Sequence, residues 1–310
     1  MALSTYETIY RAVLLRCPSA SLFLARQWVD FAFRQLWDRR LWSWQRKRGQ
    51  FIMPAAYTTG LATVTLGSTT VVGVGTTFDA TMVNRQFRLG INSPIYTIAS
   101  FTSVTQIDLG DVWGGASAAS APFSIYQAYV TAPSDFQDFI SVYDPQMNWQ
   151  LALHISQEEL NSWDAQRAST GTAYVVADLD YDTVNTPPLP RYEIWPHQTA
   201  QYVYPFLYTS RPPDLSDAGA ALPRMIRGDV LLEMALAQAS RWPGPSKDQP
   251  NPYFNMGLAA SHDATSQRML FDMERTDEEI VLNNLSYFSA NSLPFATLPT
   301  GDSRWLQSHA

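Results

Sequence analysis

The stretch from Pro190 to Trp242 constrains the fold most, because it changes from a two-residue to a helical period. Apolar and aromatic residues alternate with others over 191–196 and 201–208, a pattern typical of β-strands. Pro196 and Pro205 cannot donate to a ladder, which places these strands at a sheet edge or end. Over 223–242 the apolar residues recur at helical spacing, and Pro223 suits a first turn. We expect this block to pack one helix over a small sheet.

The N-terminal part predicts two helices. The first covers 4–16, with Ser4 or Thr5 as its cap and Glu7 in its first turn. The second covers 19–41, where four large aromatic residues extend the apolar stripe around most of the helix: Phe23, Trp28, Phe31 and Trp37. Such a helix is buried on several sides, either by its own chain or by a neighbouring copy.

Residues 51–130 differ in composition from both flanks, because Thr, Val, Ser and Gly dominate and charges are few. The runs 62–66 and 69–73, separated by Gly67 and Ser68, predict a hairpin. Further strands are expected at 86–89, 95–101, 106–109 and 123–129. We therefore predict a small antiparallel β domain inserted into a helical frame.

The expected fold class is α+β, a helical frame with long N- and C-terminal helices around that insert. The frame comprises 1–50 and 131–284, and 285–310 forms a C-terminal arm. Within 131–284 we expect helices at 133–140 and 156–167 and strands near 149–154 and 174–179. Asn251 and Pro252 predict the start of a final helix that Asn283 and Asn284 end near residue 282.

Charge is unevenly distributed. Residues 1–50 carry nine basic and three acidic side chains, a net charge of +6, whereas the whole chain carries −7. Such asymmetry indicates either a nucleic-acid contact or a docking face for an acidic partner. Solvated helix faces explain it more simply, because the bases are spread along the helices.

Two segments are candidates for contact with a partner. Residues 41–48 interleave aromatic and basic side chains, which stack on single-stranded bases or, more often, form a partly buried edge. Residues 285–310 keep large apolar groups that a disordered tail rarely contains, so we predict an arm on a neighbouring subunit. Packing on its own chain is the alternative. The candidate contact residues are Trp42, Trp44, Arg46, Lys47, Arg48, Tyr287, Phe288, Phe295 and Trp305.

The sequence contains no motif that predicts catalysis, a cofactor or a metal. Cys17 is the single cysteine, and the four histidines lack the spacing of metal ligands. Residues 178–182 resemble the start of a calcium loop, but Thr183 and Leu189 replace its glycine and glutamate. We see no signal peptide and no apolar run of about 20 residues, so a protein made in a reducing cytosol is expected.

Three segments resemble the head-to-tail connector, or adaptor, proteins of tailed bacteriophages. They are Leu189-Pro190-Arg191-Tyr192-Glu193-Ile194-Trp195-Pro196, Arg211-Pro212-Pro213-Asp214-Leu215 and Ile226-Arg227-Gly228-Asp229-Val230-Leu231-Leu232-Glu233. The resemblance covers most of the chain. These motifs are structural, and no catalytic residue comes with them.

The resemblance implies a structural virion protein rather than an enzyme. Connectors form a closed ring, here of about twelve copies, beneath the portal protein. The ring extends the DNA channel and attaches tail or nozzle proteins, and double-stranded DNA passes without sequence-specific binding. The implied location is the virion neck, after assembly in the host cytoplasm and without a membrane. A carbohydrate- or host-surface-binding virion module, with exposed aromatics on the β domain, is the alternative.

Overall fold

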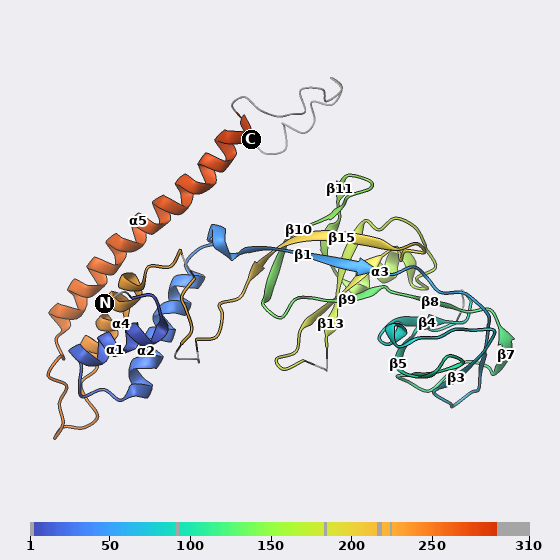
Figure 1. Cartoon of the computed structure of the whole chain (residues 1–310), viewed down its shortest axis with the longest axis horizontal. Helices are drawn as coiled ribbons and strands as arrows, with labels where there is room; N and C mark the ends of the chain where they lie inside the picture. The colour runs from blue at the N-terminus through green and yellow to red at the C-terminus, as the bar shows by residue number, and fades with distance from the viewer. Residues whose placement is uncertain (1–2, 91–92, 183–184, 216–218, 224, 290–310) are drawn as a thin grey trace. The chain divides into compact units, whose positions relative to one another are not determined.

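The computed structural model describes residues 3–90, 93–182, 185–215, 219–223 and 225–289, with side chains described as far as residue 278. The chain divides into two compact units (Figure 1). One, here called the helical unit, combines 1–45 with the chain from Pro212 onward, and the other, the β unit, comprises Arg46–Arg211. Each unit is described by itself.

The expectation of a helical frame with a small β insert is wrong. The described residues form fifteen strands in three sheets and only five α-helices. Strands continue well beyond residue 130, as far as Ser210. The helical stretches that the pattern did predict correctly are concentrated in the helical unit.

Four helices build the helical unit: α1 (Tyr6–Arg16), α2 (Leu22–Asp38), α4 (Gly228–Arg241) and α5 (Met256–Ser289). Thr5 caps α1 as expected, accepting from the Thr8 amide. The helix predicted from Pro223 instead starts at Gly228. A side chain there would collide with the Leu3 carbonyl oxygen, because a Cβ would lie 2.0 Å from it.

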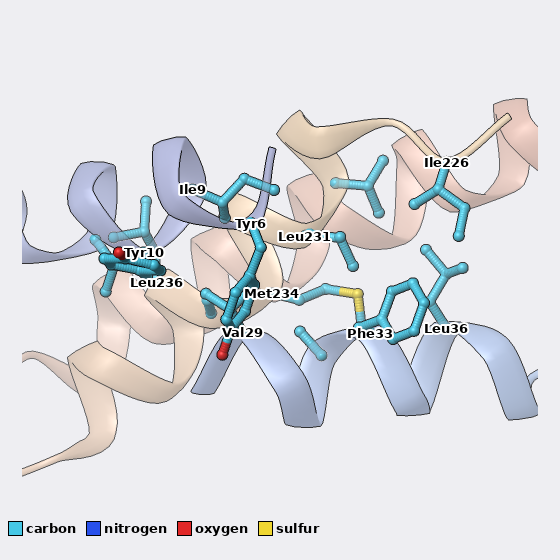
Figure 2. Close-up of a cluster of buried hydrophobic side chains, with 14 of the residues drawn as sticks. Tyr6, Ile9, Tyr10, Val29, Phe33, Leu36, Ile226, Leu231, Met234 and Leu236 are labelled. Atoms are coloured by element: carbon cyan, nitrogen blue, oxygen red, sulfur yellow. The ribbon is translucent and has the colours of Figure 1, made fainter. Parts of the chain in front are cut away.

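One hydrophobic core joins α1, α2 and α4 (Figure 2). Figure 2 shows Ile9 from α1, Phe33 from α2 and Leu231 from α4 converging, and all three are fully buried. Along each helix the residues of this core recur at spacings of three or four, which places them on one face. That regular spacing explains why the helical stripes were readable from the sequence. Burial of a side chain of this size contributes roughly 2 kcal/mol.

The start and the end of α5 differ from the prediction. The helix begins at Met256, where the Asn255 side chain accepts from the Gly257 and Leu258 amides. Asn251, the expected cap, is instead a buried hub: its amide donates to the Ala239 and Trp242 carbonyls. Asn283 and Asn284 do not stop the helix, which continues to Ser289.

In the β unit, the first four-stranded sheet has the order β1 (Arg46–Met53), β15 (Tyr202–Ser210), β10 (Phe136–Asp144) and β11 (Trp149–Gln150). Its core face carries Phe51, Phe139 and Phe206 in mutual ring contact. The edge position expected for the strand with Pro205 is wrong, because β15 lies between β1 and β10. Pro205 is tolerated because the β10 ladder stops at Phe206.

The helix expected at 133–140 is also wrong, because Phe136–Asp144 is strand β10. Register shifts on both sides of the Asp138–Phe139 pair break its alternation. Phe136, Phe139 and Val142 therefore all face the core although they lie three residues apart. That spacing imitates a helix in the sequence.

The second four-stranded sheet has the order β12 (Ala152–Ile155), β13 (Val175–Tyr181), β14 (Pro190–Trp195) and β9 (Tyr129–Thr131). β14 is also an interior strand, because it lies between β13 and β9. Pro196 is tolerated there because it lies just beyond the end of the strand. The short helix α3 (Gln157–Asp164) contacts β13, and Ser156 caps it by accepting from the Glu159 amide.

The third sheet has seven strands and curls into a half-barrel (Figure 1). Its order is β7 (Ala118–Ala121), β2 (Leu61–Val64), β3 (Thr70–Val74), β6 (Gln106–Leu109), β5 (Tyr96–Ser103), β4 (Gln86–Arg88) and β8 (Ser124–Tyr126). The predicted hairpin is present, with Val64 opposite Val71. Its hydrophobic core includes the mutually packed rings of Phe78, Phe87 and Phe123.

Candidate interaction surface

Trp42 and Trp44, two of the predicted contact residues, belong to the core of the helical unit. Trp42 is fully buried, its indole nitrogen donates to the Leu36 carbonyl, and its ring stacks on Trp44 at 4.5 Å. Arg40 covers the Trp42 ring, with 5.4 Å from its guanidinium carbon to the ring centroid. The Trp42 side chain is therefore not accessible to a partner in this structure.

The residues around this tryptophan pair are connected to α5. The buried carboxylate of Asp277 accepts from the Ser43 amide and hydroxyl. Arg39 forms an ion pair with Glu274, and Arg40 forms one with Glu278. Two of the nine basic side chains of residues 1–50 are thus paired with the acidic half of α5.

Arg46, Lys47 and Arg48 lie on β1, the edge strand of the first sheet. Lys47 forms an ion pair with Asp135. Burial alone would raise the pKa of Asp135, but hydrogen bonds from Lys47 and Tyr208 outweigh it and lower that pKa. Arg46 and Arg48 are exposed and have no ion-pair partner among the described side chains.

Two of the other candidates lie on α5, and two lie outside the described residues. Tyr287 and Phe288 lie within the backbone of α5, so this part of the predicted arm is helical. Phe295 and Trp305 lie outside the described residues. The contacts of the candidate residues with the portal protein or a neighbouring subunit therefore stay predictions.

Several large apolar side chains of the helical unit are exposed, and the sequence indicated only some of them. On α2, Trp37 is buried and Trp28 packs on Trp242, whereas Phe23 is 76% exposed and Phe31 is 55% exposed. Leu15 on α1 and Phe271 on α5 are 80% and 64% exposed. The all-round apolar character of α2 was the available signal for Phe23 and Phe31.

Two surface grooves lie beside these side chains. A groove of about 560 Å³ between α2 and α5 is lined by Phe31, Leu36, Met234 and Leu270, among others. A second, of about 540 Å³, lies between α1 and the start of α2 and is lined by Tyr10, Leu14, Leu15 and Leu22 with Arg11. Apolar grooves with exposed apolar side chains alongside are typical of protein-binding surfaces.

A buried polar cluster in the β unit is structural in character. Arg167 binds Glu193 at 2.7 Å, and Arg88 donates to the carbonyls of Gly90 and Arg167. His197 stacks on Tyr126 at 4.0 Å. Burial, and then Arg88, lower the pKa of His197 to about 4, so its ring is neutral at physiological pH. Through the bond from Arg88 to the Arg167 carbonyl, the cluster connects the half-barrel to the second sheet.

Within the described part of the chain, no group of three or more His, Cys, Asp or Glu side chains is arranged to hold a metal ion. Tyr253, His262 and Glu233 form a hydrogen-bonded row, with distances of 2.8 and 2.6 Å, that joins α5 to α4. Over the residues described, no helix has the length and hydropathy of a membrane span.

No protein-family model matches the chain, and no curated protein matches it.

Proposed function

We propose that this chain is a head-to-tail connector of a tailed bacteriophage. It is a structural protein of the virion neck that forms a ring beneath the portal, extends the DNA channel and provides the attachment site for the tail. The starting point is the resemblance carried by residues 189–196, 211–215 and 226–233.

The observation that carries the proposal is the uncovered apolar surface of the helical unit. Phe23, Phe31 and Leu15 are more than half exposed while the same helices bury a continuous core. An isolated protein that keeps such side chains in water gains solubility and stability when a partner covers them. Repeated contacts between copies, closed by rotation, cover this surface on every subunit.

The proposed mechanism is mechanical. The ring docks beneath the portal of a filled head and continues its channel toward the tail. The net charge of −7 disfavours retention of phosphates, so double-stranded DNA passes without sequence-specific contact. No chemical conversion is part of this function.

The carbohydrate-binding alternative receives no support from the segment where it was expected. In the described part of 51–130, the exposed large apolar side chains are aliphatic, for example Val72, Val74 and Val104. The aromatic rings Phe78, Phe87, Trp113 and Phe123 are buried in the half-barrel.

The test uses virions of the phage that encodes the chain. Mass spectrometry should find the chain in purified particles, and electron microscopy should place a ring of it between head and tail. Deleting its gene should leave filled heads that do not join tails. Virions without the chain, or tailed and infectious particles after the deletion, would refute the proposal.

A further inference from the structure

Three aromatic side chains that the hydrophobic core leaves half exposed gather on the β unit. Trp163 on α3, Tyr174 before β13 and Trp149 on β11 are 48%, 45% and 42% exposed. The rings of Trp163 and Tyr174 both pack on buried Trp195, at 6.0 and 4.9 Å. Trp149 donates to the carbonyl of Ala173, next to Tyr174. Together we call Trp149, Trp163 and Tyr174 the aromatic face.

Carboxylates accompany the aromatic face. Glu159 precedes Trp163 by four residues on α3, which places the two side chains on one side of the helix. Glu158 and Glu159 are exposed, and neither has an ion-pair partner among the described residues. Asp164 adds a further negative charge. Burial opposes its ionisation, but hydrogen bonds from the Ser169 and Ala168 amides lower its pKa to about 2.

This combination fits the cation of an arginine or lysine side chain. A guanidinium over the face of a Trp or Tyr ring is attracted by its quadrupole, and a carboxylate beside the ring adds an ion pair. Tyr, Trp and Arg are also the residues that dominate protein interfaces energetically. The expected ligand is therefore an exposed basic segment of a protein.

The chain itself carries a segment of that kind. Arg46 and Arg48 lie two residues apart on β1, so they point to the same side of the strand about 7 Å apart. Both are exposed and lack an ion-pair partner among the described side chains. Lys47 points to the opposite side and binds Asp135. We call Arg46 and Arg48 the basic edge.

The basic edge and Trp149, one member of the aromatic face, belong to opposite edges of one sheet. The order is β1, β15, β10, β11, so the basic edge is on the first strand and Trp149 is on the last. With neighbouring strands about 4.8 Å apart, the outer strands are separated by about 14 Å. Two different, complementary patches on one rigid unit are what a head-to-tail contact between identical copies requires.

We propose that the basic edge of one copy docks on the aromatic face of a second copy of this chain. Arg46 and Arg48 lie over the rings of the partner and pair with its Glu158 and Glu159. The inference rests on the proposed ring and names a contact within it. It is independent of the apolar surface of the helical unit.

Site-directed crosslinking tests the contact directly. Gln50→Cys, beside the basic edge, is combined in one chain with Ser162→Cys, beside the aromatic face, which leaves every proposed contact residue in place. Mild oxidation of the purified chain and of purified virions should then give a ladder of disulfide-linked species beyond the dimer. Each single variant should give no species larger than a dimer, and Cys17 is buried in all of them.

Charge reversal supplies a second readout. Arg46→Glu with Arg48→Glu, or Glu158→Lys with Glu159→Lys, should weaken self-association in sedimentation at least about tenfold. Because the reversed patches complement each other, mixing the two variants should restore assembly. Asp111→Lys is the matched control and should have no effect, because Asp111 is an exposed carboxylate with no ion-pair partner among the described side chains.

The outcomes separate the two proposals. A ring that forms without a ladder and tolerates both charge reversals overturns this contact but leaves the connector function intact. A chain that is monomeric in solution and forms no ring in virions overturns both. An oligosaccharide that quenches the tryptophan fluorescence of the aromatic face, in the absence of a ladder, would instead identify the face as a sugar site.

Discussion

The Cys17 thiol lies 3.2 Å from the side-chain carbonyl oxygen of Asn251, 234 positions away in the sequence. Ser19 donates to the same oxygen, and so does the backbone amide of Tyr253. Asn251 thus joins the turn between α1 and α2 to the loop between α4 and α5. Because Asn251 is buried and uses both ends of its amide, the helical unit depends on it.

Replacing Asn251 with alanine should destabilise the helical unit by roughly 3 kcal/mol, because the Ala239 and Trp242 carbonyls lose their donor. Urea unfolding followed by circular dichroism measures this loss. Asn255→Ala, which removes only an exposed helix cap, should cost about 1 kcal/mol. Equal effects of the two variants would contradict the hub role.

Replacing Phe23 and Phe31 with serine should leave the stability of the monomer within about 0.5 kcal/mol, because both side chains are exposed. The same variant should weaken self-association and incorporation into virions, since it removes apolar surface that a partner covers. Phe33→Ala, two residues from Phe31 but fully buried, should cost about 3 to 5 kcal/mol. Unchanged assembly of the double serine variant would argue against this surface.

Replacing Trp42 with alanine should reduce stability by about 3 to 5 kcal/mol, because a buried ring and its hydrogen bond to Leu36 are lost. Arg48→Ala, on the exposed edge of β1, should leave stability unchanged. Thermal unfolding of both variants distinguishes a core residue from a surface residue. A stable Trp42→Ala protein with a specific defect in partner binding would show that Trp42 is a contact residue after all.

The stability of the β unit should fall as the pH falls from about 6.5 to about 4, because the pKa of His197 is lowered to about 4. The folded protein keeps the ring neutral over this range, whereas the unfolded chain takes up a proton, so unfolding is favoured. Stability is highest above about pH 6.5, and the loss by about pH 4 amounts to roughly 3 kcal/mol.

Urea midpoints measured between about pH 7 and pH 4 test this dependence. In His197→Phe, which cannot titrate, the slope of stability against pH should be shallower over this range. An identical slope in both proteins would show that His197 is not buried as a neutral ring.

The periodicity of the sequence determined the local elements whose burial is regular. Helices α1, α2 and α4 were predictable because each buries one stripe against neighbours, and the 61–74 hairpin because its residues alternate. Thr5 and Ser156 were predictable as caps because a cap acts within three residues.

Tertiary packing decided the rest. The bulges of β10 give core residues a helical spacing, and only its pairing with β15 reveals a strand. Asn251 has the local sequence of a helix cap, yet distant donors and acceptors make it a buried hub. The two edges of the first sheet bring Arg48 and Trp149 onto one unit although 100 residues separate them. Local patterns report which face of an element is apolar, but they do not report which distant segment covers it, and that choice sets both the fold class and the candidate surfaces.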